Sequence, residues 1–376
     1  MSLCAGRLLH RQFSTSICLK YPRSMRLRNT SSPALEKETN DNVEFRHFPV
    51  MKNEILAFLD PKEDEKFLDM TFGGGGHSRS ILKCSPTSQV FALDRDPVAY
   101  NIAKTLSINY RDRLHPMLGR FSELDTVAKD IGLQEGILDG VVIDAGCSSM
   151  QFDTAERGFA LSKSGPLDMR MDGDNRHENQ PTAADVVNSL NVETLARIIK
   201  AYGEERQAKK IAQLIVEFRE KYHPIKTTSE LANIVSFAFT HTQSSQSKDM
   251  IGRKMHVATR TFQALRIFVN NELEELSNGL NLVSKFLKPG GRIAVLTFHS
   301  LEDRIVKRIL QGRHAMEPGK SIHQKKRDNF TYNTESGHEN QIKIWSFDDK
   351  FMEPSEKEVE KNPRSRSAKL RKAVKL

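Results

Sequence analysis

Cysteine, tryptophan and long apolar runs are scarce in this chain of 376 residues, which has four cysteines and one tryptophan. No two cysteines form a C-x-x-C pair, so neither a disulfide framework nor a structural zinc site is indicated, and a reducing compartment is expected. No apolar run approaches the roughly 20 residues that a membrane-spanning helix needs. With 38% hydrophobic residues the chain can still bury a full core. We therefore expect a globular protein with no membrane segment and no bound metal.

Acidic residues are missing from both ends of the sequence. Before Glu36 there are six basic residues and no acidic one, and from Lys361 onward there are seven basic residues and again no acidic one. These thirteen charges exceed the net charge of +9, and residues 36–360 hold 44 basic against 48 acidic side chains. If this central part binds nucleic acid, it must do so through a local basic patch and not through an overall field.

The N-terminal segment adds hydroxyl clusters at 14–16 and 30–32 to its basic residues. This composition is typical of organelle transit peptides, whereas a secretory signal would need an uninterrupted apolar core. We predict that residues 1–35 are a disordered mitochondrial transit peptide and that the protein acts in the mitochondrial matrix. A merely disordered basic tail is the alternative.

Short apolar segments alternate with segments of helical periodicity, at 67–71, 77–83, 89–94, 96–106, 114–118, 121–131 and 139–144. Such alternation predicts an α/β fold with a mainly parallel sheet covered by helices. The strand pattern resumes at 292–298, after one long amphipathic helix whose apolar stripe runs from Phe262 to Val283. A last strand is expected at 342–347.

Residues from about 151 to 256 break this alternation and show only loop and helix patterns. Two helical faces can be identified from their spacing: Ile211, Ile215, Phe218 and Tyr222 on one, and Leu231, Ile234, Val235 and Ala238 on the other. The region is therefore interpreted as a helical insertion in the α/β fold.

Four consecutive glycines follow the first predicted strand, within the segment from Phe67 to Ser78. Glycine lacks Cβ and reaches positive φ, so the backbone N–H groups of this turn and of the next helix can approach a ligand closely. A nucleotide-containing cofactor is usually received in this way. A dinucleotide fingerprint would need a further glycine where Ser78 stands, which disfavours NAD.

Acidic side chains end two other predicted strands. Asp94 follows the strand 90–93, where a carboxylate accepts hydrogen bonds from ribose hydroxyls. Asp96 before Pro97 is a good helix cap, so we assign ribose binding to Asp94 and capping to Asp96. Asp144 ends an apolar strand, where a carboxylate is costly to bury unless it is hydrogen-bonded or functional.

Ligands of parallel α/β sheets bind beyond the carboxyl ends of the strands. Four segments should therefore meet at one rim: 73–77, Asp94, 144–149 and 297–300. In the last of these, Ser300 and Asp303 resemble a capping box, which leaves His299 without an explanation. The segment 157–172, which follows the rim, is open to two interpretations: a lid over the site, or a structured loop in which methionines fill gaps.

Nine segments of the sequence resemble those of a known protein family, which the composition alone does not reveal. They are FGGGGHS, DRDP, GRFSEL, AERGF, GPLDMRMD, YGEERQAKKIA, ATRTFQALRIFVNNELEEL, FHSLEDRIVKR and NPRSRSAKLR. In this order, over roughly Glu44 to Lys372, the chain resembles the RsmH/MraW family of small-subunit rRNA cytosine-N4 methyltransferases. With its N-terminal segment it is most similar to the mitochondrial branch of that family. The resemblance implies a Rossmann-like class I methyltransferase that methylates N4 of a cytidine in the mitochondrial 12S rRNA of the small ribosomal subunit, in support of mitoribosome assembly and translation.

The resemblance also implies the cofactor, S-adenosylmethionine, with its adenine against Phe121 and its ribose on Asp94. The matching cofactor-binding positions are Gly75, Gly76, His77, Asp94, Phe121, Asp144 and Gln151. A homodimer is a state that the sequence leaves open.

Pattern and resemblance together divide the chain into four parts. We predict the transit peptide at 1–35, an S-adenosylmethionine-binding methyltransferase domain formed by 44–150 and 257–352, a helical insertion for substrate recognition at 151–256, and a basic C-terminal tail at 353–376.

Methyl transfer to cytosine N4 needs an acceptor for an amino proton, because the nitrogen lone pair is delocalised into the ring. We expect Asp144 to be that acceptor, with Ser148 or Ser149 beside it, and His299 or Phe298 to hold the base. The segment 144–149 lacks the Asp-Pro-Pro-aromatic signature of many amino methyltransferases. The base-stacking residue therefore stays open among Phe152, Phe159 and Phe298.

Two other functions compete with this one. Cys147 as a thiolate nucleophile would indicate C5 methylation of cytosine, but no basic neighbour in the sequence favours a lowered thiol pKa. A catalytically silent ribosome-assembly factor would use the fold for docking and the basic C-terminal tail for RNA. The presence of every cofactor position named above argues against that alternative.

Overall fold

The computed structural model describes residues 49–173, 177, 179–240, 246–248, 254–313 and 343–376. A compact unit spans Phe45–Leu376. The predicted transit peptide and the first residue of the predicted strand 342–347 lie outside the described residues. Among the described helices, none combines the length and the apolar character that crossing a membrane requires.

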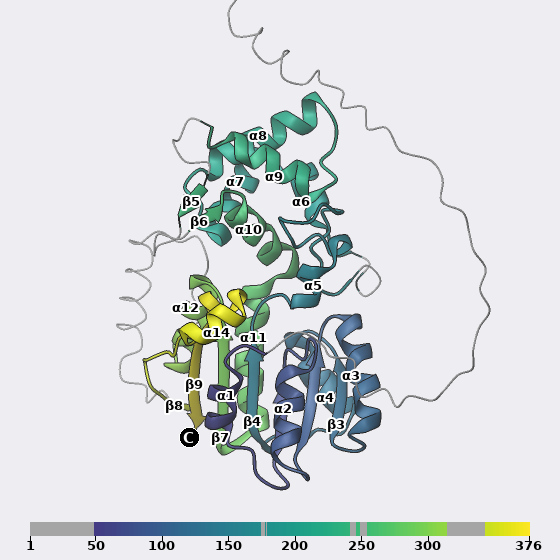
Figure 1. Cartoon of the computed structure of the whole chain (residues 1–376), viewed down its shortest axis with the longest axis vertical. Coiled ribbons are helices and arrows are strands. Elements are labelled where there is room, and N and C mark those ends of the chain that lie inside the picture. The colour runs from purple at the N-terminus through teal and green to yellow at the C-terminus, as the bar shows by residue number, and fades with distance from the viewer. Residues whose placement is uncertain (1–48, 174–176, 178, 241–245, 249–253, 314–342) are drawn as a thin grey trace, which may run out of the picture. The chain divides into compact units, whose positions relative to one another are not determined.

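The compact unit is built on a seven-stranded sheet with the order β3-β2-β1-β4-β7-β9-β8 (Figure 1). Its strands are β1 (Lys66–Asp69), β2 (Gln89–Asp94), β3 (Leu114–Leu118), β4 (Leu138–Asp144), β7 (Leu287–Thr297), β8 (Trp345–Phe347) and β9 (Lys369–Lys375). The pairs among β1, β2, β3, β4 and β7 are parallel, and β9 pairs antiparallel with β7 and β8. The predicted α/β fold with a mainly parallel sheet is confirmed.

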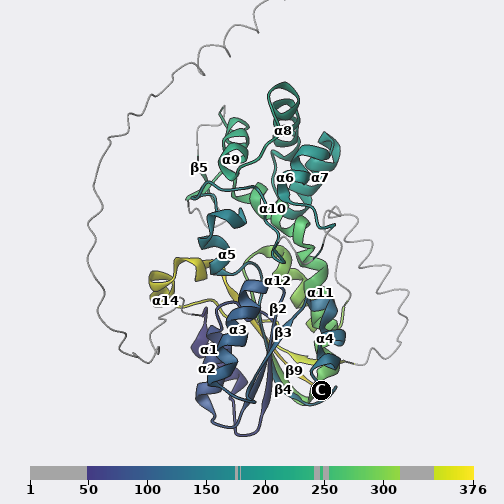
Figure 2. The same cartoon turned by 90° about the vertical axis from the view of Figure 1, so that its right-hand side faces the viewer.

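Helices cover both faces of the sheet because successive side chains of a strand point to opposite sides. Phe67 packs with α1 (Lys52–Leu59), α2 (Gly76–Cys84) and α3 (Pro97–Asn109). The next residue, Leu68, packs with α4 (Leu124–Asp130), α11 (Glu272–Phe286) and α12 (Ser300–Leu310) on the other face. Figure 2 shows these two helical layers with the sheet between them.

The C-terminal segment corrects the sequence interpretation. Residues 353–376 were expected to form a basic tail, but they are structured. Their first part forms α14 (Glu356–Lys361) and a 3₁₀ turn at Pro363–Ser367. The last part is β9, whose Leu370 and Ala373 are buried in the core. The basic side chains conceal the alternation of this strand, because long charged residues can lie along a sheet and still reach solvent or an acidic partner.

The helical region forms a core of its own. It contains α5 (Ser149–Asp153), α6 (Ala183–Ser189), α7 (Val192–Gly203), α8 (Ala208–Lys221), α9 (Thr228–Phe237) and a short hairpin of β5 (Gln246–Lys248) and β6 (Lys254–His256). The predicted face of α9 is confirmed, since Leu231, Ile234 and Val235 are buried, as is Ala238 just after the helix. The predicted face of α8 holds for Ile211 and Ile215 but fails at Tyr222, which lies after the helix end and is 56% exposed.

The predicted single helix with a stripe from Phe262 to Val283 is in fact two helices. Asn271 has φ 50 and separates α10 (Thr259–Asn270) from α11. Phe262, with its helix α10, packs in the helical core, whereas Val283 of α11 packs against the sheet. The stripe is core packing as expected, but it serves two cores, and α10 joins them.

Candidate active site

The glycine turn between β1 and α2 has the geometry that a closely bound ligand requires. Gly73 and Gly75 have φ of 52 and 77, a region that side chains with Cβ rarely adopt. A Cβ on Gly75 would lie 2.7 Å from the ring of Phe72, and a Cβ on Gly76 would lie 2.9 Å from Pro49. Nothing described lies within 4 Å of a Cβ position on Gly74. Phe72 and Pro49 therefore pack against the turn at Gly75 and Gly76, whereas the turn is open at Gly74.

Ser78 has a structural role in this turn. Its hydroxyl donates to Asp69 Oδ2 at 2.6 Å, and both side chains are fully buried. Asp69 also accepts from the backbone N–H of Thr71 at 3.1 Å, and burial raises the pKa of its carboxyl group. The serine that disfavours a dinucleotide fingerprint thus holds the acidic end of β1, a contact that sequence reasoning missed.

Asp96 is the helix cap that the sequence predicts, whereas Asp94 contacts the glycine turn. The Asp96 carboxylate accepts from Val98 N–H at 3.0 Å and caps α3. The two oxygens of Asp94 accept from the backbone N–H groups of Gly73, at 2.7 Å, and of Asp96, at 2.8 Å. Burial raises the pKa of Asp94 to about 7, against the lowering effect of these two hydrogen bonds. The carboxylate at the end of β2 is therefore tied directly to the glycine turn.

Asp144 and His77 face each other across the rim. The Asp144 carboxylate lies 3.8 Å from His77 Nε2, and the backbone N–H of Asp144 donates to the Thr71 hydroxyl at 2.7 Å. His77 is buried, and its Nε2 has no hydrogen-bond partner among the described residues. Buried polar atoms are nearly always hydrogen-bonded. This orphaned nitrogen beside an open glycine turn fits a polar ligand at the predicted cofactor position.

Ser148 and Gln151 hold the start of α5. The Ser148 hydroxyl accepts from Gln151 N–H at 3.3 Å, and Gln151 Oε1 accepts from Ser148 N–H at 3.0 Å. Gln151 Nε2 donates to Asp96 Oδ2 at 2.8 Å. Both polar atoms of the buried Gln151 side chain are therefore engaged by the protein, and its geometry is that of a positioning residue. Its predicted contact with cofactor, and the substrate role of Ser148 and Ser149, stay predictions.

The loop after β7 differs from its predicted capping arrangement. His299, not Ser300, is the N-cap of α12, and its Nδ1 accepts from Glu302 N–H at 3.4 Å. Glu302 Oε2 in turn accepts from Phe298 N–H at 2.7 Å. Ser300 instead donates to Glu204 at 2.6 Å. The sequence signal was misread because histidine is an unusual cap, and Glu three residues later is the usual partner.

The aromatic candidates occupy different environments. Phe121 begins a 3₁₀ turn (Phe121–Glu123) and packs so closely on α11 that a Cβ on Gly279 would lie 2.9 Å from it. Phe159 is buried in the helical core, and the guanidinium of Arg364 lies 5.5 Å from the ring centre of Phe152. Phe298 is half-buried at the rim. Phe152 and Phe298 are thus half-buried and Phe159 is buried, and the stacking role of any of the three stays a prediction.

The segment 157–172 has the features of a structured loop. Its Leu167, Met169 and Met171 are buried in the helical core. Arg157 Nη1 lies 2.7 Å from Asp96 Oδ2, so the loop is fixed to the rim by an ion pair. The methionines fill gaps, as one of the two interpretations expected.

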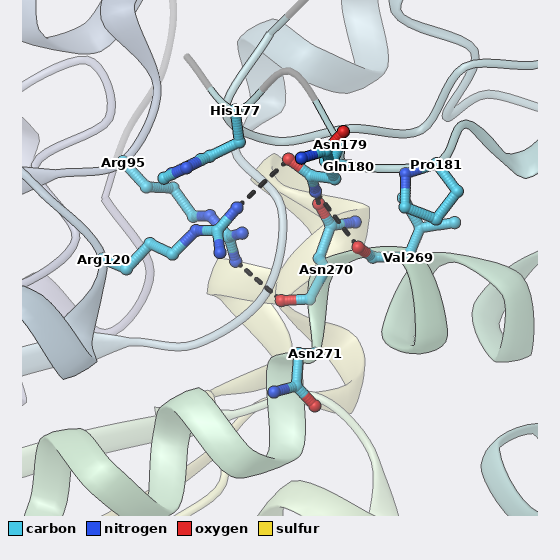
Figure 3. A pocket seen from close by; sticks show the side chains of 9 residues that line it. All are labelled: Arg95, Arg120, His177, Asn179, Gln180, Pro181, Val269, Asn270 and Asn271. Atoms are coloured by element: carbon cyan, nitrogen blue, oxygen red, sulfur yellow. Dashed lines mark hydrogen bonds between the residues drawn. The ribbon is translucent and has the colours of Figure 1, made fainter.

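Asp172, at the end of this loop, is fully buried and binds two arginines. Arg95 Nε donates to it at 3.1 Å, and Arg120 Nε donates to it at 3.2 Å. Burial acts to raise the pKa of Asp172, but the two guanidinium groups lower this pKa below its usual value. Beside them lies a polar cavity of about 390 Å³ (Figure 3), lined by Arg95, Arg120, His177, Asn179, Gln180, Pro181, Val269, Asn270 and Asn271. Sequence reasoning missed this pocket, although its arginines adjoin the predicted cofactor residues Asp94 and Phe121.

Cys147 lacks the environment of a nucleophile. Burial raises the pKa of its thiol to about 11, against the lowering effect of Arg266, whose Nη1 lies 3.2 Å from the sulfur. A thiol of this kind is almost entirely protonated at neutral pH, and the thiolate is the reactive form. The structure therefore gives no support to C5 methylation through Cys147.

We expect Cys147→Ala to retain methyl-transfer activity within about threefold of the wild type, because a protonated thiol contributes only weak hydrogen bonding. Initial rates of methyl incorporation into small-subunit rRNA test this. Loss of activity in a variant that still binds S-adenosylmethionine normally would restore the thiolate mechanism.

The sheet order, the glycine turn after β1 and the carboxylates at the ends of β2 and β4 define a Rossmann-like class I methyltransferase. The chain belongs to the MraW methylase family, whose model matches residues 44–376. This membership confirms the resemblance found in the nine sequence segments.

Relatives support the same placement. The chain is 50% identical over 337 residues to the protein of Mus musculus named 12S rRNA N(4)-cytidine methyltransferase METTL15, with 88% of this chain and 82% of that protein covered. The protein of the same name from Homo sapiens is 50% identical over 340 residues, with 88% and 83% covered. The ribosomal RNA small subunit methyltransferase H of Hyphomonas neptunium is 44% identical over 328 residues, with 87% and 88% covered.

Proposed function

We propose that this protein uses S-adenosylmethionine to methylate N4 of a cytidine in small-subunit rRNA, and that its substrate is the mitochondrial 12S rRNA. The observation that carries the proposal is the meeting of the glycine turn, Asp94, His77 and Asp144 at one rim of the sheet. The relatives with 44–50% identity are named as rRNA methyltransferases, and the N-terminal composition supports action in the mitochondrial matrix.

The residues of the rim fit the cofactor. The open side of Gly74 gives backbone access, Asp94 presents a carboxylate to ribose hydroxyls, and His77 Nε2 supplies a buried polar atom that needs a partner. Phe121 beyond β3 supplies an apolar ring for the adenine. When bound, S-adenosylmethionine supplies an electrophilic methyl group on a sulfonium ion.

The protein's own contribution to the reaction is orientation and proton removal. The backbone N–H of Asp144 donates to the Thr71 hydroxyl, which fixes the end of β4, and the carboxylate faces His77 at the rim. From there it can accept the proton that the cytosine amino group must lose as the new N–C bond forms. The water-poor surroundings of the buried His77 and Gln151 strengthen these interactions.

Purified protein gives the direct test. Small-subunit particles from cells that lack this methyltransferase are incubated with the protein and S-adenosylmethionine, and their rRNA is digested and analysed by mass spectrometry. The proposal predicts N4-methylcytidine in stoichiometric amount. The appearance of C5-methylcytidine, or tight binding to the particles without methyl transfer, would contradict it and favour one of the two competing functions.

Cofactor affinity should depend on pH through Asp94. Because burial raises the pKa of Asp94 to about 7, the free protein carries an ionised acceptor for ribose above pH 7 and a protonated one below it. We expect the dissociation constant for S-adenosylmethionine to rise by about tenfold per pH unit below pH 7 and to level off above it.

Isothermal calorimetry between pH 5.5 and 8.5 measures this dependence, with Asp94→Asn as the control. The variant should bind more weakly and show a flat profile over the same range. Folding stability should change in the opposite direction for the wild type, falling as the pH rises from about 4 to 7, because the unfolded chain ionises Asp94 first. A pH-independent affinity would remove Asp94 from the ribose contact.

A further inference from the structure

Arg266 of α10 is a largely buried cation where three other segments meet. Only 15% of its side chain is exposed. Its Nε and Nη2 donate to the two carboxylate oxygens of Glu272 at 2.8 and 2.9 Å, and its Nη1 donates to Cys147 Sγ at 3.2 Å. Nη2 also lies 3.9 Å from Glu302 Oε1. The guanidinium therefore joins α10, α11, α12 and the loop that follows β4.

Two carboxylates hold this guanidinium in place. The bidentate pair with Glu272 fixes its plane, which is the geometry in which arginine and carboxylate interact most strongly. Glu302 is almost fully buried. Burial acts to raise the pKa of Glu302, but His299 and Arg266 lower this pKa below its usual value. The cluster is thus a charged network and its cation is fixed by contacts on two sides.

Two residues of the loop after β4, Gly146 and Cys147, lie next to this cluster. The sheet holds the loop as far as Ala145, whose N–H donates to Leu296 O at 3.1 Å, and the capping box of α5 holds it from Ser148 onward. Gly146 lies between them with φ 101. A Cβ built on Gly146 would lie 3.7 Å from both Arg266 Nη2 and Glu302 Oε1. At Gly146 the backbone between Asp144 and Ser148 therefore faces the Arg266–Glu302 side of the cluster.

The helix that carries Arg266 also packs in the helical region. Phe262, Leu265 and Val269 of α10 are part of that core, whereas Glu272 begins the helix that covers the sheet. A shift of α10 relative to the sheet would move the guanidinium and, with it, the loop that leads from Asp144 to α5.

We propose that Arg266 is a positioning residue for methyl transfer: its guanidinium, held by Glu272, supports the turn at Gly146 and thereby the orientation of Asp144 and Ser148, and it couples that turn to the helical region. The weak hydrogen bond to the protonated Cys147 thiol is not required for this role. This inference rests on the proposed function, because it concerns the same rim. It assigns Arg266 no contact with the cofactor or the substrate.

The test uses the full-length Arg266→Lys variant, which keeps the charge and removes the planar fork. We expect the single-turnover rate of methyl transfer to small-subunit particles to fall by about 10- to 100-fold, as for other losses of alignment at a reacting centre. The dissociation constant for S-adenosylmethionine should stay within threefold. Hydrogen exchange at the amides of 146–149 should accelerate, whereas exchange in β4 at 140–143 should not change.

Two further variants make the outcome decisive. Arg304→Lys is the matched control, since Arg304 forms an exposed pair with Glu204, and it should leave all three readouts unchanged. Glu272→Gln keeps the shape of the partner and should lower the transfer rate in the same direction as Arg266→Lys.

Three results would overturn the inference: a wild-type transfer rate in Arg266→Lys, unchanged exchange at 146–149, or a loss of rate that is fully matched by loss of cofactor affinity. If the wild-type protein itself transfers no methyl group, the proposed function fails. The exchange measurement still decides whether Arg266 fixes the turn.

Discussion

Replacing Asp144 by asparagine should abolish methyl transfer almost completely while leaving the fold intact. The amide keeps the size of the carboxylate and its place at the end of β4, but it cannot accept the proton that the cytosine amino group loses. Removal of a general base typically lowers a rate by about 10²- to 10⁴-fold, and we expect a loss in this range. Single-turnover rates with small-subunit particles measure it.

Binding of S-adenosylmethionine to Asp144→Asn should weaken far less than the rate falls, because Asp94 and the glycine turn are unchanged. Asp125→Asn is the matched control: the same chemical change is made on α4, at an exposed ion pair of Asp125 with Lys285 of α11, and no effect on rate is expected. If Asp144→Asn transfers methyl groups at more than about a tenth of the wild-type rate, Asp144 is not the proton acceptor.

Removing the Arg371 side chain should destabilise the whole fold. Arg371 is 2% exposed in β9, and its guanidinium donates to both oxygens of Asp303 at 2.6 and 3.2 Å and to the carbonyl of Asp349 at 3.0 Å. Arg371→Ala leaves the Asp303 carboxylate largely buried without its main partner. Breaking such a pair from one side destabilises a protein by about 3–5 kcal/mol, which we expect in the free energy of unfolding measured with urea.

Lys372→Ala is the control for Arg371→Ala. It removes the same charge from the neighbouring position of the same strand, where the ammonium lies 5.3 Å from the ring centre of Phe58. Its destabilisation should stay below about 1 kcal/mol. Equal effects of the two substitutions would mean that the C-terminal segment acts as a charged tail and not as an internal strand of the sheet.

The parallel part of the fold could be predicted from the sequence because its signals are local. Each strand from β1 to β4 is a short, mainly apolar segment, and β1, β2 and β3 are each followed by a helical pattern. The final strand could not be predicted in this way. Leu370 and Ala373 of β9 stand among lysines and arginines, and the evidence for a strand is long-range: pairing with β7 and an acidic partner, Asp303, on α12.

The rim residues show the same division between local and long-range information. The glycine turn and the cap at Asp96 follow from residue type and position. The contacts of Gln151 with Asp96 and of Arg266 with Cys147 join segments far apart in the chain, so they were not predictable. The cap at His299 is local, with Glu302 three residues later, and was missed because histidine is an unusual cap. The split of the long helix at Asn271 was missed because the apolar stripe continues through it without a break.

Nucleoside mass spectrometry of mitochondrial small-subunit rRNA tests the central claim most directly. Cells that lack the protein would be compared with the same cells carrying either the wild-type chain or Asp144→Asn at equal abundance. The account predicts that N4-methylcytidine is lost without the protein, returns with the wild-type chain and stays absent with the variant. An unchanged level of N4-methylcytidine in cells without the protein would contradict it.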